Sequence, residues 1–293
     1  MGQRSFIIGI ISAVAVFCIW SGFFVVSRMG VTTALTPYDL AALRFMVAGV
    51  VTLPFVWWWW PRGLAWWQAP LLFVCGPGSI YTMVLYYGLQ NAPAAYAGVF
   101  ANGSIPIATM LLAAIISKDY PGPWRMLGIA VLYLGGTMVG LRGLGSGAGD
   151  VTQAIVMFVA SSLLVSTYIY AISRWGLSPW NALAVVNVPN LILYLPVWYF
   201  LLPSGLDLAT AEEIGLQVAF QGLGPGFFAL IFFTLAAKHL GASATSGFSA
   251  AVPAGVAVLA IPVLGEAPTL MEWAGIAFVT IGLAILVLRK RTS

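Results

Sequence analysis

The stretch that decides the fold is Phe6–Val26, FIIGIISAVAVFCIWSGFFVV, because its 21 residues include no charged side chain. A bilayer core of about 30 Å requires about 20 apolar residues in a helix, so this stretch is long enough for one crossing. It is longer than the apolar region of a typical signal peptide, and it lacks a cleavage site with small residues at alternate positions. It is therefore predicted to be a transmembrane helix.

Nine further apolar runs of similar length follow. Hydrophobic residues make up 61% of the 293 residues and charged residues only 7%, whereas a soluble domain is about 25% charged. The connections between the runs are too short to hold a separate domain. The sequence predicts an all-α polytopic membrane protein with ten transmembrane helices. These runs are 6–26, 40–60, 69–90, 94–117, 123–141, 151–173, 179–201, 217–237, 242–264 and 271–288.

The distribution of charge orients the predicted helices, because cytoplasmic loops carry an excess of Lys and Arg. With both termini in the cytoplasm, most basic residues fall on the cytoplasmic side, and every acidic residue except Asp119 falls outside. The cytoplasmic basic residues are then Arg4, Arg62, Lys118, Arg125, Arg174, Lys238, Arg289, Lys290 and Arg291, and the outer ones are Arg28, Arg44 and Arg142. Both termini are predicted to be cytoplasmic.

The second half of the chain repeats motifs of the first. Matching segments are Ser27-Arg28-Met29-Gly30 with Ser173-Arg174-Trp175-Gly176, Thr36-Pro37-Tyr38-Asp39 with Ser178-Pro179-Trp180-Asn181, and Gly76-Pro77-Gly78 with Gly224-Pro225-Gly226. Later matches, such as Pro106 with Pro253 and Pro121 with Pro268, keep a constant spacing of 147 residues. The predicted halves are 1–144 and 151–293, packed as one domain. Because each has five crossings, the second is inverted relative to the first, as in many secondary transporters.

The polar residues disfavour several classes of function. The net charge of +4 comes from basic residues scattered singly, so no patch follows a nucleic-acid backbone. With one His, no paired carboxylates inside a run and no Cys/His cluster, the sequence offers little for an enzyme, a metal or a cofactor. Cys18 and Cys75 lie in apolar runs and are predicted to be small buried hydrophobes.

Motifs in both halves carry a family resemblance. They are Trp20-Ser21-Gly22, Pro37 through Arg44-Phe45, and Ala92-Pro93-Ala94-Ala95 with Pro106, followed by Gly241-Ala242-Ser243, Pro253, Leu264-Gly265-Glu266-Ala267-Pro268, Gly275 and Gly282. With these motifs the chain resembles, over essentially its whole length, the ten-helix members of the drug/metabolite transporter superfamily with two EamA-type halves. One departure is Ser117-Lys118-Asp119, where the family usually has Leu-Gly-Glu.

The resemblance implies a transporter of the bacterial inner membrane, most similar to exporters of aromatic and other neutral amino acids. Its implied partners are a small-molecule solute and membrane lipid, and homo-oligomer formation is left open. It also implies a central cavity lined by the first, third, fourth, sixth, eighth and ninth helices, with the fifth and tenth helices at the periphery. Small residues suited to close helix contact there are Gly128, Gly135, Gly136, Gly140, Gly275 and Gly282.

Polar and aromatic residues inside the runs are candidates for lining this cavity, since polar groups at membrane depth usually face the bundle interior. Ser79, Thr82 and Tyr86, for example, share one helical face. The alternative is that hydroxyl groups bond back to their own helix. The candidate substrate-binding residues are Trp20, Ser79, Tyr81, Thr82, Tyr86, Asn102, Ser162, Ser166, Tyr168, Gln221, Ser246 and Ser249.

Three of the prolines within the predicted crossings are candidate hinges. Pro106, Pro225 and Pro253 each remove a backbone donor from the helix. Each could mark a fixed packing kink or a bend that lets half a helix move. Because they fall at related positions of the two halves, we expect them to act as hinges.

No Asp or Glu lies near the middle of any run, so no carboxylate proton relay is evident. A cavity without fixed charge, but with Tyr, Trp, Ser, Asn and Gln, suits a neutral or zwitterionic solute with an apolar side chain. The expected function is alternating-access export of small neutral or aromatic amino acids and related metabolites, with facilitated or weakly coupled transport. A lipid or polyprenyl-carrier flippase, or an exporter of other small metabolites or drugs, is the alternative on the same fold.

Overall fold

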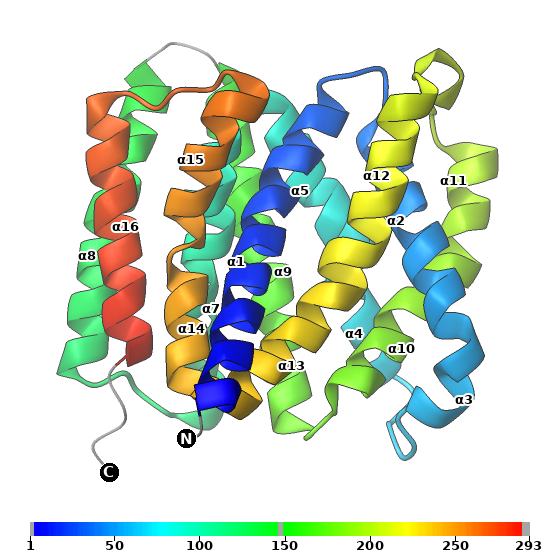
Figure 1. The fold of residues 1–293 in the computed structure, drawn as a ribbon, viewed down its shortest axis with the longest axis horizontal. Helices are drawn as coiled ribbons and strands as arrows, with labels where there is room; N and C mark the ends of the chain where they lie inside the picture. The colour runs from blue at the N-terminus through cyan, green and yellow to red at the C-terminus, as the bar shows by residue number, and fades with distance from the viewer. Residues whose placement is uncertain (1–2, 146–148, 289–293) are drawn as a thin grey trace.

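The computed structural model describes residues 3–145 and 149–288, and the regular elements in these ranges are helices. Figure 1 shows them standing side by side, with the connecting loops at two opposite ends of the bundle. The first half contains α1 (Gln3–Val31), α2 (Pro37–Thr52), η1 (Leu53–Phe55), α3 (Val56–Trp59), α4 (Gln68–Cys75), α5 (Ser79–Asn91), α6 (Ala94–Ala97), η2 (Gly98–Asn102), α7 (Gly103–Ser117) and α8 (Pro123–Gly145). The second contains α9 (Gly149–Arg174), α10 (Pro179–Pro189), η3 (Asn190–Tyr194), α11 (Leu195–Leu201), η4 (Leu206–Leu208), α12 (Ala211–Leu223), η5 (Gly224–Phe228), α13 (Ala229–Leu240), α14 (Ala242–Ala250), α15 (Val252–Leu264) and α16 (Leu270–Leu288).

The prediction of an all-α polytopic membrane protein is confirmed. In the described part of the chain, nine spans are long and apolar enough to cross a membrane. The ninth predicted crossing, 242–264, is split into α14 and α15, which meet at Ala251. The eighth crossing begins at Ala211, earlier than the predicted residue 217, because Thr210 and Glu213 form a capping box that starts α12 within a polar segment.

Glycine and proline interrupt crossings in both halves. Gly76-Pro77-Gly78 separates α4 from α5, and a side chain on Gly76 or Gly78 would collide with backbone carbonyl groups of α4. The corresponding Gly224-Pro225-Gly226 lies in η5, a π-helical turn between α12 and α13. Discontinuous crossings of this kind free backbone groups at membrane depth and commonly mark binding sites in transporters.

The starts of α2 and α10 have the same local structure. Thr36 caps α2 and forms a capping box with Asp39, and Ser178 caps α10 and forms one with Asn181. Each cap is followed by a proline. Asp39 is fully buried and also accepts hydrogen bonds from Trp198 Nε1 at 2.9 Å and from the Ser204 hydroxyl at 2.7 Å. This carboxylate therefore ties the start of α2 to the segment after α11.

Helices α8 and α16 form the predicted close pair at one edge of the bundle (Figure 1). A side chain on Gly135 would meet the carbonyl group of Gly275, and one on Gly275 would meet the carbonyl group of Gly135. Gly128 and Gly282 make a similar contact, so close packing through these four glycines is confirmed. Gly136 and Gly140 instead face the ring of Phe100.

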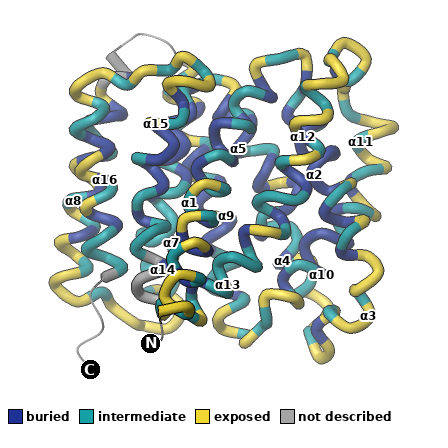
Figure 2. Tube along the Cα trace, viewed as in Figure 1, coloured by how far each residue is buried: buried dark blue, intermediate teal, exposed yellow. Residues whose placement is uncertain are grey.

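The buried side chains lie on the inner sides of the helices. Figure 2 shows buried segments in α1, α2, α5 and α15, and exposed ones along α8, α11 and α16. Exposed positions on α8 and α11 include large side chains such as Tyr133, Phe200 and Leu201. In a membrane these apolar surfaces face lipid.

Candidate functional site

A group of buried polar side chains joins α1, α2, α5 and α12. Ser27, Arg44, Tyr86, Gln217 and Gln221 form this central polar cluster, and each is at most 5% exposed. Gln221 Nε2 donates to the Ser27 hydroxyl at 2.8 Å and to Gln217 Oε1 at 3.2 Å. The hydroxyl of Tyr86 donates to Gln221 Oε1 at 3.3 Å. The cluster therefore places a connected set of donors and acceptors inside an apolar bundle.

Arg44 gives the central polar cluster a positive charge. Its guanidinium carbon lies 5.4 Å from the centre of the Phe23 ring and 5.8 Å from that of Phe45. The same guanidinium acts electrostatically on Tyr81 and Tyr86. Its Nε and Nη1 atoms are buried and have no hydrogen-bond partner. Buried polar groups usually have a partner, so these two atoms are exceptions.

Arg44 was predicted to lie among the charges of the outer side, in a protein whose cavity has no fixed charge, but the structure buries it inside a crossing. Helix α2 begins at Pro37, so Arg44 lies two turns inside the crossing and is only 5% exposed. A signal was present in the sequence, because Arg44 falls within the predicted apolar run 40–60. An ionisable residue inside a crossing usually marks a functional position.

Two of the predicted residues, Tyr81 and Tyr86, lie within electrostatic reach of Arg44, and a third, Gln221, is hydrogen bonded to Tyr86. Trp20 lies elsewhere on α1, half buried, and packs against Phe233 of α13 with ring centres 5.7 Å apart. The predicted site residues are thus distributed over several places in the bundle.

Ser79 and Thr82 belong to the break between α4 and α5. The backbone N–H of Ser79 donates to Asn190 Oδ1 at 2.9 Å, and Asn190 Nδ2 donates to the Val186 carbonyl at 2.7 Å. The Thr82 hydroxyl donates to carbonyl groups of its own segment, Gly78 and Ser79. For Thr82 the bond back to its own helix, foreseen as an alternative, is the one observed. Asn190 was missed as a partner of this break.

A second group of candidates lies near α7 and α9. Ser166 donates to the Ile105 carbonyl of α7 at 3.1 Å, and Ser162 is buried with an unpartnered hydroxyl. Asn102 is half buried in the π-helical turn η2, and Tyr168 packs over Gly76. None of these contacts reaches the guanidinium of Arg44.

The last candidates lie on α14 and at irregular turns. Ser249 donates to the Thr245 carbonyl of its own helix at 3.4 Å, and the side chain of Ser246 lies outside the described part of the structure. Pro106 lies inside α7, Pro225 in η5, and Pro253 in the first turn of α15. Each proline thus lies in or next to an irregular stretch of its crossing, while hinge motion at these prolines stays a prediction.

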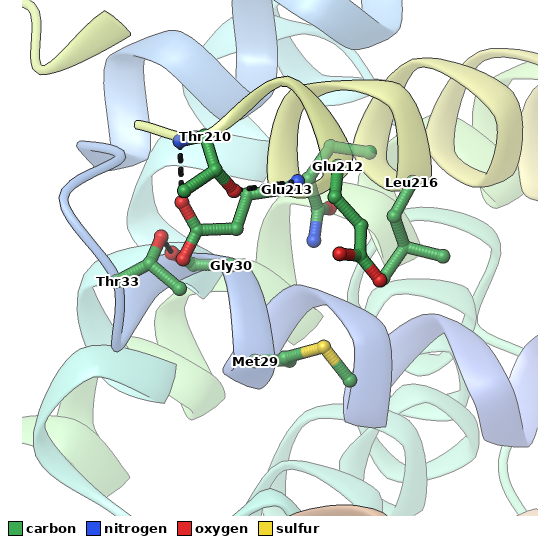
Figure 3. Close-up of a pocket in the computed structure, with 8 residues that line it drawn as sticks. Met29, Gly30, Thr33, Thr210, Glu212, Glu213 and Leu216 are labelled. Atoms are coloured by element: carbon green, nitrogen blue, oxygen red, sulfur yellow. Dashed lines mark hydrogen bonds between the residues drawn. The ribbon is translucent and has the colours of Figure 1, made fainter. Parts of the chain in front are cut away.

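A pocket of about 230 Å³ lies between the end of α1 and the start of α12 (Figure 3). Its wall includes Met29 and Thr33 of the first segment and Glu212, Glu213 and Gln217 of the second. Since Gln217 is also hydrogen bonded to Gln221, the pocket ends at the central polar cluster.

At one end of the bundle, an ion pair joins distant parts of the chain. Arg28 Nε and Glu266 Oε1 are 2.8 Å apart. Arg28 also donates to the carbonyl groups of Leu89 and Gln90 at the end of α5, and Glu266 Oε2 accepts from the Ala94 N–H at 2.8 Å. These contacts, called the Arg28 clamp below, join α1, α5, α6 and the segment after α15.

The apolar bundle, the interrupted crossings and the enclosed polar cluster together define a polytopic membrane transporter. The chain belongs to the EamA-like transporter family, which it matches over residues 7–141 and 152–288. The family expected from the sequence motifs is therefore confirmed, and family membership makes the chain a transporter and not an enzyme.

Two individual proteins are similar along nearly the whole chain. "Uncharacterized transporter sll0355" from Synechocystis sp. is 24% identical, in an alignment that covers 96% of this chain and 90% of that protein. A solved structure titled "Crystal structure of protein" aligns with a TM-score of 0.64 at 19% identity and covers 98% of both chains. At that identity the structural likeness shows the fold alone.

Proposed function

We propose that this protein exports small neutral or aromatic amino acids across the bacterial inner membrane by alternating access. In this proposal residues 1–144 and 151–293 are two inverted halves, and both termini are cytoplasmic. The observation that supports it best is the origin of the central polar cluster: Ser27, Arg44 and Tyr86 come from the first half, and Gln217 and Gln221 from the second. A site built between two moving halves opens to whichever side they part on.

The polar groups and rings of the cluster suit such a solute. Tyr86 and Gln221 offer hydrogen bonds, while Phe23 beside Tyr86 and Phe45 beside Arg44 offer apolar faces. A small amphipathic molecule suits the hydrogen-bonding groups and the ring faces alike, because its polar end bonds to the cluster and its side chain packs on the rings.

Proteoliposome counterflow with a panel of amino acids tests this function. The wild-type protein is expected to prefer large neutral amino acids. Gln221→Leu is expected to lower their flux at least about tenfold, because Ser27 and Tyr86 then lose their partner inside the membrane. Thr137→Val on α8 is the control, since the Thr137 hydroxyl donates only within its own helix, to the Leu134 carbonyl.

Two outcomes contradict the proposal. Equal flux of charged and neutral amino acids argues against a selective site. If wild-type protein in liposomes transports no amino acid but moves labelled lipid between leaflets, the result favours the flippase alternative.

A further inference from the structure

Arg44 is a buried cation for which the described residues provide no carboxylate. The ion pair present among them joins Arg28 and Glu266, at one end of the bundle. The rings of Phe23 and Phe45 offset part of the cost of burying the charge. A ring face cannot satisfy the N–H groups that point outward in the plane of a guanidinium, and Nε and Nη1 of Arg44 have no partner. An acceptor that enters this plane would complete the site.

The surroundings restrict what that acceptor is. Within the described residues no other Lys or Arg is buried, so a phosphate with two charges would be poorly neutralised. A carboxylate carries one charge and is the planar group that guanidinium binds best. The hydroxyls of Tyr81 and Tyr86 lie within electrostatic reach of Arg44 and can bind the remaining polar atoms of such a ligand.

We propose that Arg44 binds the carboxylate group of the transported solute, with the solute's apolar part against the neighbouring aromatic rings. This role for Arg44 adds detail to the proposed function. It rests on that function, which supplies the identity of the solute. It narrows the substrates to molecules with one carboxylate, which are zwitterionic amino acids or simple monocarboxylates. Amines and amides of the same shape are then poor ligands.

Binding is measured first, apart from transport, by thermal unfolding of the purified full-length protein. L-phenylalanine and phenylacetate are expected to raise the unfolding temperature, and L-phenylalaninamide and 2-phenylethylamine are not. Arg44→Gln is expected to raise the half-saturating carboxylate concentration at least about tenfold, as loss of a charge-assisted hydrogen bond does. Arg44→Lys keeps the charge without the planar donors. Its half-saturating carboxylate concentration is expected to lie between those of the wild type and Arg44→Gln. Arg62→Gln, at an exposed loop position, is the control.

The outcomes separate the two proposals. Equal stabilisation by the amide and the acid, or unchanged half-saturation in both Arg44 variants, overturns the assignment of Arg44. If Arg44→Gln does not fold, unchanged half-saturation in Arg44→Lys alone overturns it. Stabilisation by carboxylates that depends on Arg44, without flux of any amino acid in proteoliposomes, contradicts the proposed function and supports the Arg44 site.

The Arg28 clamp has a counterpart in the predicted repeat, which is an independent observation. Helices α7 and α15 end alike: Lys118 and Gly265 have φ of 54° and 69°. The residues that follow them also make matching hydrogen bonds. The Asp119 N–H donates to the Ala113 carbonyl at 3.2 Å, and the Glu266 N–H donates to the Ala260 carbonyl at 3.3 Å. Asp119 therefore occupies the position of Glu266.

Arg174 occupies the position of Arg28, since both follow Ser and precede a Gly two residues later. The Ser117 and Tyr170 hydroxyls are 2.5 Å apart, which brings the end of α7 against α9 one turn before Arg174. Asp119 and Arg174 thus lie at one end of the bundle, opposite the Arg28 clamp. In this conformation Asp119 has other interactions. We infer that Arg174 pairs with Asp119 when the Arg28 clamp opens, and that the two pairs close opposite faces alternately.

Cross-linking tests the alternation. In a variant without Cys18 and Cys75, cysteines replace Arg28 and Glu266, or Asp119 and Arg174, or all four, and a short bifunctional thiol reagent joins each pair. We expect either cross-link to abolish counterflow. In the four-cysteine variant, joining residues 28 and 266 is expected to lower joining of 119 and 174 at least about tenfold, because the two pairs belong to different states. Both links in one molecule, or no link between 119 and 174 in the two-cysteine variant, overturns the inference.

Discussion

At the scale of single residues, polar side chains inside the crossings are held by particular partners. Thr82 was correctly placed inside a crossing, but its hydroxyl bonds to its own segment. Arg44 was misplaced because a charge count assigns charges to loops and does not record how deep a helix begins. The partner of Ser79, Asn190, is more than a hundred residues away in sequence, and only the packing of α5 against the second half brings them together.

Replacing Asn190 is expected to destabilise the break between α4 and α5. In Asn190→Leu the buried N–H of Ser79 and the carbonyl of Val186 lose their partners, at a cost of about 1–3 kcal/mol. Asn91→Leu is the matched control, because Asn91 donates only to the Tyr87 carbonyl of its own helix. Thermal unfolding in detergent measures both, and equal losses would show that Asn190 has no special part in fixing the break.

At the scale of elements, the sequence predicted the existence and type of the crossings well and their interior poorly. Apolar length fixes a crossing, whereas the turns at η2, η3 and η5 depend on which backbone groups find partners after folding. The glycines were likewise predicted to make close helix contacts, but the residues that they contact were not predicted. The structure divides them into those that face the α8–α16 interface and those that face Phe100.

The neighbouring residues Gly135 and Gly136 give a direct test of the α8–α16 interface. A methyl group on Gly135 would overlap the backbone of α16, so Gly135→Ala is expected to destabilise the protein by about 1–3 kcal/mol. At Gly136 the nearest atom, on the Phe100 ring, is 3.7 Å away, so Gly136→Ala is expected to be neutral or slightly stabilising. Unfolding temperatures in detergent compare them, and a larger loss for Gly136→Ala would contradict the observed contact.

At the scale of the whole molecule, the membrane class and family followed from composition and motifs, because a surface facing lipid requires apolar length everywhere. The central polar cluster did not follow, since it draws one or two residues from each of four crossings. Its members, such as Ser27 and Gln217, are ordinary residues in sequence and acquire meaning only when α1 and α12 meet.

The Arg28 clamp also affects the free-energy difference between the two states of the carrier. If opening it is repaid by a similar ion pair on the other face, the inward-open and outward-open states differ little in free energy. A preference of tenfold for one state then corresponds to only about 1.4 kcal/mol, which ordinary differences in solute binding supply. A carrier balanced in this way populates both states without an energy input, and bound solute decides which state is favoured.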